Sequence, residues 1–122
     1  MGSLEHHLRL SREKRDAALE EYEKKRYTVV GDLAIKAVEQ AIEALASLEG
    51  LHFHTDPRSA HANRMTWVKR SFPELSGYVD MLWGAYGTLG YEGVDGERAK
   101  KALEAMEVIL DGFEGKAGVR FK

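Results

Sequence analysis

The segment with the most potential chemistry is LHFHTDPRSAH, residues 51–61, which holds three of the chain's five histidines. His52 and His54 are separated by one residue, so on an extended segment their side chains would share a face and form a pair of imidazole ligands. Asp56 and His61 could complete such a site. However, the spacing matches no zinc motif such as H-E-x-x-H. We therefore interpret His52 and His54 as surface loop residues, and we predict no metal site and no cofactor.

Acid–base chemistry on RNA is the second option for this segment. Such chemistry needs a base near a ribose hydroxyl, an acid at the leaving oxygen and a cation that stabilises the phosphorane. If a helix begins here, Arg58 and His61 lie one turn apart beside its N-terminus, and His54 could join them. The candidate catalytic residues are therefore Arg58, His61 and His54. The alternative, which the pattern favours, is that His61 shares an apolar stripe with Met65 and Val68 and is a core or interface histidine.

A ligand-binding surface is the third option. Arg64, Trp67 and Arg70 follow one another at i, i+3 and i+6 on the same expected helix. A tryptophan flanked by arginines can stack on a base or cover a partner's surface. Together with Arg58, these are the candidate residues for binding a ligand or nucleic acid. The alternative, again favoured, is that Trp67 packs against a neighbouring helix while the arginines are solvated.

The charge distribution bears on the choice of partner. The net charge of −2 argues against extensive nucleic-acid binding. Residues 51–73 nevertheless carry four basic residues against one acid, and residues 74–95 carry four acids and no Lys or Arg. A local basic patch can bind phosphates even in an acidic protein, so this segment could bind a nucleotide or nucleic acid. The simpler interpretation is that two solvated faces differ in sign.

Length and composition set outer limits. The 122 residues fit one domain over 1–122, and the lack of cysteine excludes disulfides, thiolate zinc sites and cysteine nucleophiles. No apolar run approaches the roughly 20 residues of a membrane helix, and the charged N-terminus is no secretory signal, so we expect a cytoplasmic protein without membrane association. Because MGSLEHH could be a cloning remnant, His6 and His7 receive little weight.

Hydrophobic periodicity predicts five helices and no strands. The expected helices run over about 3–26, from Asp32 to a stop at Gly50, from Asp56 to Arg70, from Ser71 onward, and from Asp95 or Gly96 to Phe113. The connections are short, which favours an up-and-down bundle. The second helix is apolar around most of its circumference and is therefore expected at the centre. The tail from about residue 115 is expected to fray.

The expected helix starts depend on capping residues. Asp32 is a good N-cap for the second helix. Asp56 would cap the third helix, with Pro57 at its first position. Ser71 and Glu74, three residues apart, would form a capping box for the fourth.

The fourth helix carries Gly77, Gly84 and Gly87 at near-helical spacing, together with an apolar face that includes Tyr78. Each glycine costs about 1 kcal/mol relative to alanine in a helix. Close approach of another helix, from this chain or a partner, would offset that cost. A loose helix around residues 84–90 is equally compatible with the pattern. Asp80 is expected to be exposed or paired with a basic residue of the third helix.

The order of these motifs resembles the HEPN superfamily of small helical bundles. DLAIKAVEQAIEALASLEG is similar to that family's Ala-rich second helix, and AYGTLGYEG and ERAKKALEAMEVILDGF follow in the family's order. The resemblance implies an all-α, HEPN-like bundle that forms a homodimer with a cleft between the subunits. It also implies one of two roles, as an RNase of a toxin–antitoxin or defence system or as the non-catalytic partner of a small nucleotidyltransferase.

The family's RNase motif is an Arg followed after four to six residues by His. Here Arg58 is followed by His61 only three positions on, and no other arginine has a histidine at the required distance. We therefore favour a non-enzymatic or degenerate HEPN-like protein, a homodimeric partner or substrate-binding module that acts beside a nucleotidyltransferase. The alternative is a divergent, metal-independent RNase of a toxin–antitoxin system that uses Arg58 and His61.

Overall fold

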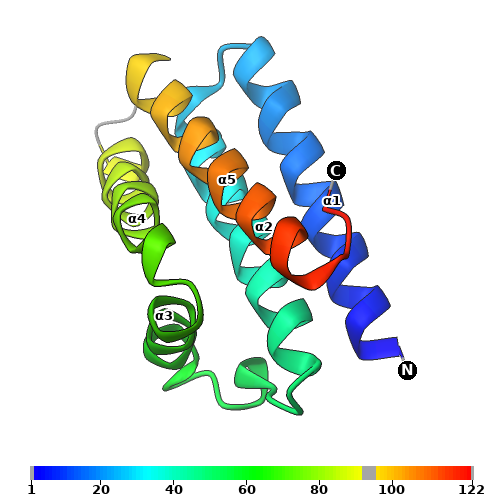
Figure 1. Cartoon of the computed structure of the whole chain (residues 1–122). Coiled ribbons are helices and arrows are strands. Elements are labelled where there is room, and N and C mark those ends of the chain that lie inside the picture. Colours follow the sequence, from blue (N-terminus) through cyan, green and yellow to red (C-terminus); the bar gives the residue numbers. More distant parts are fainter. Residues whose placement is uncertain (1, 92–95, 122) are drawn as a thin grey trace.

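The structure is a computed structural model that describes residues 2–91 and 96–121, and in these ranges all regular structure is helical (Figure 1). The helices are α1 (Gly2–Glu23), α2 (Tyr27–Ser47), α3 (Ala60–Ser71), α4 (Ser76–Tyr91) and α5 (Gly96–Ala117), with short 3₁₀ helices η1 (Phe53–Thr55) and η2 (Pro73–Leu75). The prediction of an all-α bundle is confirmed. No helix within the described ranges is long and apolar enough to cross a bilayer.

Helix α2 lies at the centre, as its all-round apolar sequence predicts. It packs against α1, α4 and α5 and touches α3. Val30, Ala34, Val38 and Ala41 have no exposed surface. The facing side of α5 is equally buried, so the continuous core lies mainly between these two helices.

The start of α2 differs from the prediction. The helix begins at Tyr27, so Asp32 lies inside it and is no N-cap. Val30 and Gly31 are both buried here, and their burial outweighs the weak helix preference of the β-branched run. Helix α1 ends at Glu23, and Lys25 in the turn that follows adopts a left-handed backbone with φ 62°.

The predicted caps of the third and fourth helices are also wrong. The α3 helix begins at Ala60, and the Asp56 carboxylate accepts a hydrogen bond from the Ser59 hydroxyl in the preceding turn (2.8 Å). Ser71 is the last residue of α3, so it forms no capping box for α4. Phe72 breaks the helix with an extended φ of −137° and buries its ring in the core.

The C-terminal tail is packed, and the prediction that it frays is wrong. Helix α5 continues to Ala117, and the Phe121 ring is fully buried 6.2 Å from that of Phe113. The Phe121 N–H donates to Glu114, and Arg12 on α1 donates to the Arg120 carbonyl. Figure 1 shows the C-terminus lying beside α1. Burial of one large aromatic ring therefore anchors a segment that was expected to fray.

Gly77 and Gly84 of α4 do not lie at a close helix contact within the described part of this chain. The helix runs unbroken from Ser76 to Tyr91, and a Cβ added at Gly77 or Gly84 would meet no atom within 4 Å. Gly87 lies where the surroundings of the side chains are not described. Tyr78 was expected on the apolar face but is exposed. The close approach occurs instead at Gly112 of α5, where a Cβ would lie 2.9 Å from Leu75.

Asp80 behaves as expected. Its carboxylate accepts a hydrogen bond from Lys69 of α3 at 2.7 Å, and both side chains are exposed. This pair links the acidic segment to the basic one on the surface.

Candidate functional site

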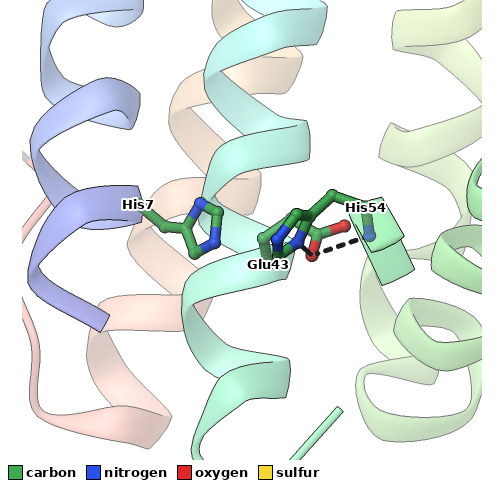
Figure 2. Close-up of side chains that lie close together, drawn as sticks. All are labelled: His7, Glu43 and His54. Carbon is green, nitrogen blue, oxygen red and sulfur yellow. Dashed lines mark hydrogen bonds and ion pairs between the residues drawn. The ribbon is translucent and has the colours of Figure 1, made fainter. Parts of the chain in front are cut away.

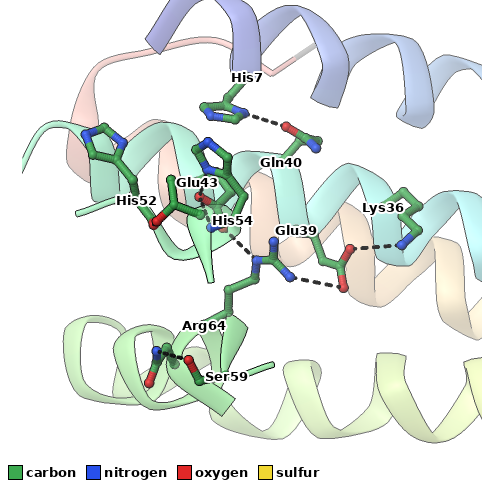
Figure 3. Close-up of polar contacts among 11 residues, drawn as sticks. His7, Lys36, Glu39, Gln40, Glu43, His52, His54, Ser59 and Arg64 are labelled. Atoms are coloured by element: carbon green, nitrogen blue, oxygen red, sulfur yellow. Dashed lines mark hydrogen bonds and ion pairs between the residues drawn. The ribbon is translucent and has the colours of Figure 1, made fainter. Parts of the chain in front are cut away.

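Glu43 is a carboxylate buried on the polar side of α2, with 1% of its surface exposed. It follows Lys36, Glu39 and Gln40 at helical spacing, so these four residues form one polar strip on an otherwise apolar helix. The strip faces α1, η1 and the start of α3 (Figure 3). A charge in this position must be paired, because an isolated buried carboxylate is strongly disfavoured.

Both oxygens of Glu43 accept hydrogen bonds from residues of the 51–73 segment. Oε1 accepts from the His54 ring at 2.8 Å and, at 3.3 Å, from the His54 backbone N–H. Oε2 accepts from Arg64 Nε at 2.7 Å. The Arg64 guanidinium also lies 3.8 Å from Glu39, which pairs in turn with Lys36 (Figure 3).

These contacts determine the charge of Glu43. Burial alone raises the pKa of Glu43, but the hydrogen bonds from His54 and Arg64 together lower it by more. The pKa therefore lies below the ordinary value of a glutamate. Glu43 is therefore an anion at neutral pH.

His7 reaches the same cluster from α1. Its side chain is buried, and Nδ1 lies 2.6 Å from the amide oxygen of Gln40. An amide oxygen only accepts, so Nδ1 carries the proton and Nε2 of a neutral ring keeps its lone pair. The His7 and His54 rings are 5.0 Å apart between centroids. One ring nitrogen of each histidine and one oxygen of Glu43 all lie within 4.8 Å of one another (Figure 2).

Of the predicted catalytic residues, only His54 belongs to this cluster. His61 is exposed in the first turn of α3, with its ring 5.8 Å from that of Trp83, so its interpretation as a core histidine is wrong. Arg58 is exposed in the turn before α3, so the two residues do not share a helix as expected. Asp56 is engaged by Ser59 in the loop instead of joining the histidines.

Of the predicted binding residues, Arg64 contacts the Glu43 cluster and Trp67 packs elsewhere. Arg64 is largely buried in its ion pairs with Glu43 and Glu39. The Trp67 ring is buried against Phe72, and its indole N–H donates to Glu49. The packing interpretation of Trp67 is thus confirmed, whereas that of a solvated Arg64 is wrong, because the buried Glu43 needs a cation.

Sequence reasoning missed His7 and Glu43. The only available signal for Glu43 was a charged residue in a helix expected to be buried on most of its circumference. His7 carried no such signal, because the helical register of α1 against α2 decides which of its residues faces Gln40.

A separate pocket of about 280 Å³ lies where α2, α3 and α5 end. Its lining residues are Leu45, Leu48, Glu49, Trp67, Arg70, Ser71, Phe72, Lys116 and Ala117. Lys116 donates to the Ser71 carbonyl at 3.0 Å and lies 4.8 Å from the centre of the Phe72 ring. The pocket therefore combines aromatic and aliphatic walls with two cations, Arg70 and Lys116, and one carboxylate, Glu49.

Comparison with known proteins gives no relative. No family model matches this chain, and no curated protein or solved structure matches it either.

Proposed function

We propose that the chain is a HEPN-like, homodimeric module that binds a ligand bearing a ring and an anionic group, such as a nucleotide, and that acts beside a nucleotidyltransferase. The pocket at the ends of α2, α3 and α5 is the observation that carries this proposal. It also retains two of the residues that the spacing in the sequence selected, Trp67 and Arg70.

The pocket favours a small, ring-bearing ligand. Its volume lies just below the roughly 300 Å³ at which ligand pockets begin, so it accommodates a ring rather than a large cofactor. Leu45 and Phe72 supply apolar contact. Three helix C-termini meet here, and their partial negative charge opposes an anion, as does the Glu49 carboxylate. Arg70 and Lys116 must therefore supply the attraction.

Binding of AMP, followed by amide NMR shifts, tests this proposal. We expect shifts at Ser71, Lys116 and Ala117, and we expect Arg70→Gln to weaken binding by about tenfold, as for one charge-assisted contact. Arg26→Gln is the matched control, because Arg26 is exposed just before the first residue of α2, whereas the pocket lies at the C-terminal end of that helix. Equal weakening in both variants, or no binding by the wild type, rejects the pocket as the site.

The homodimer is supported by the exposed side of α4. Tyr78 and Met81 are large, exposed apolar residues, and Gly77 and Gly84 beside them leave room for a second copy to approach. Sedimentation velocity should show a dimer at micromolar concentration and a monomer for Met81→Glu. A wild-type monomer at that concentration would contradict this part of the proposal.

Metal-independent RNA cleavage is the second candidate function, and the Glu43–His54 pair favours it. A buried carboxylate that hydrogen-bonds an exposed imidazole is an arrangement that orients a general base. Arg58 and His61 would then supply the cation and the acid. This candidate requires that single-stranded RNA be cleaved in the presence of EDTA and that His54→Ala, Arg58→Ala and His61→Ala each abolish cleavage. Absence of cleavage by the wild-type protein eliminates it.

A further inference from the structure

Three elements that are distant in the sequence bring potential metal ligands together. His7 comes from α1, Glu43 from the C-terminal part of α2 and His54 from η1, and Figure 2 shows the three side chains converging. Their ligand atoms lie within 4.8 Å of one another. We propose that His7, Glu43 and His54 form a binding site for a divalent transition metal, with Zn²⁺ as the ion that the ligand set fits best.

Two of the three ligands are already oriented by second contacts. His7 donates its Nδ1 proton to Gln40, which leaves Nε2 as the ligand atom. The Arg64 guanidinium holds the second oxygen of Glu43, which leaves Oε1 directed at the histidines. Metal-binding histidines and carboxylates typically have such outer partners, because these fix the tautomer and the orientation of the ligand.

His54 is the ligand that can move to bring its ring nitrogen onto a bound ion. Its side chain is 44% exposed, and it lies in a 3₁₀ helix of three residues, so its ring can shift at little cost. Its Nδ1 now donates to Glu43 Oε1. An ion between these two atoms would replace that proton, and the ring would instead carry its proton on Nε2.

The ligand set determines the class of ion. Two imidazole nitrogens and one carboxylate oxygen suit Zn²⁺ and related transition metals, whereas Ca²⁺ and Mg²⁺ prefer oxygen ligands alone. Three protein ligands leave a fourth tetrahedral position for water. The further histidines beside the site are His6, whose ring lies 5.4 Å from that of His7, and His52, whose ring lies 6.1 Å from that of His54.

The charges around the site balance before any ion binds. Glu43 and Glu39 are both acids, Arg64 contacts both of them, and Lys36 contacts Glu39. The anionic ligand for the ion is therefore Glu43 alone. The metal site is independent of the AMP pocket, which does not include His7, Glu43 or His54. Failure of either proposal therefore leaves the other standing.

Calorimetric titration of the full chain with Zn²⁺, after EDTA treatment and without an affinity tag, tests the proposal. We expect one ion per chain in the wild type and no measurable binding of Mg²⁺. Because His54 is exposed, His54→Ala should fold normally and lower the Zn²⁺ affinity by at least about tenfold. Gln40→Ala should lower it by about 10- to 100-fold through loss of the partner that orients His7.

His61→Ala is the matched control, because His61 is an exposed histidine outside the cluster. Its Zn²⁺ affinity should equal that of the wild type. Two results would overturn the proposal. One is no binding of Zn²⁺ by the folded wild type, and the other is equal affinity in wild type and His54→Ala, which would place the ion elsewhere on the surface.

Discussion

The ion pairs Arg15–Glu107 and Arg64–Glu43 both join helices of this bundle, and they differ in how many hydrogen bonds the arginine makes to the carboxylate. Arg15 of α1 meets Glu107 of α5 with Nε and one terminal nitrogen on the two carboxylate oxygens, at 2.7 and 2.8 Å. Arg64 of α3 contacts Glu43 of α2 with Nε alone, and the other Glu43 oxygen faces His54. In the first pair the arginine hydrogen-bonds both oxygens of the glutamate. In the second pair it hydrogen-bonds only one oxygen, and the other accepts from the His54 ring.

The two pairs also differ in their access to water. The side chain of Glu107 is 29% exposed, whereas that of Glu43 is 1% exposed. Water can therefore hydrate Glu107 if its partner is lost, whereas water does not reach Glu43 while His54 and Arg64 are in place. The comparison indicates that Arg15–Glu107 stabilises the contact of α1 with α5, whereas the Glu43 cluster is the one with capacity for chemistry.

Of the substitutions that compare the two ion pairs, removal of Glu43 should lower the free energy of unfolding the most. Glu43→Ala leaves Arg64 without its buried partner, and we expect a loss of about 3 to 5 kcal/mol in the free energy of unfolding. Urea denaturation measures this value. Glu43→Gln, which keeps the size and one acceptor, should lose less. A loss below about 1 kcal/mol in Glu43→Ala would show that Glu43 is not buried as described.

The next largest effect should appear in the pH dependence of the free energy of unfolding, to which Glu43 contributes. The folded-state pKa of Glu43 is lowered, so its contribution to stability is present above the unfolded pKa of about 4.3 and is lost as the pH falls through the folded pKa. The free energy of unfolding of the wild type should therefore fall more steeply below about pH 4.3 than that of Glu43→Gln. Parallel curves for the two proteins would contradict the lowered pKa.

Arg15 provides the contrast in this series. Its hydrogen bond to Glu107 outweighs the opposite effect of burial and raises the already high pKa of its guanidinium. The charge of Arg15 is consequently constant over the whole range.

Loss of Arg15 should have the smallest effect. Arg15→Ala removes a fork that is partly exposed, so we expect a loss of about 1 kcal/mol in the free energy of unfolding by urea denaturation. Zn²⁺ affinity should not change, because Arg15 lies outside the His7–Glu43–His54 site. A loss as large as that of Glu43→Ala would remove the distinction between the pairs.

Much of the fold follows from the sequence. The apolar faces of α2 and α5 are long and regular, and both helices occupy the core as predicted. The errors fall where tertiary burial outweighs local preference. Val30 extends α2 ahead of Asp32, Phe72 interrupts the expected capping box, and Phe121 anchors a tail that looked disordered.

The candidate site could be predicted only in part. His54 was selected by its place in a histidine-rich segment, but its expected partners were neighbours in the sequence, Asp56 and His61. Its actual neighbours, His7 and Glu43, depend on how α1 and η1 pack against α2. Helical spacing grouped Arg64 with Trp67, yet spacing does not say which face is buried. Arg64 is paired with Glu43, and the Trp67 ring packs against Phe72.

The most direct test of the His7–Glu43–His54 site is to determine which ring nitrogens of the histidines carry protons, by long-range ¹H–¹⁵N NMR with and without Zn²⁺. Without metal, we expect the His7 and His54 protons on Nδ1. With Zn²⁺, His7 Nε2 and His54 Nδ1 should both shift, the His54 proton should move to Nε2, and His61 should be unchanged. A His7 proton on Nε2 in the metal-free protein, with no response of either ring to Zn²⁺, would contradict the account.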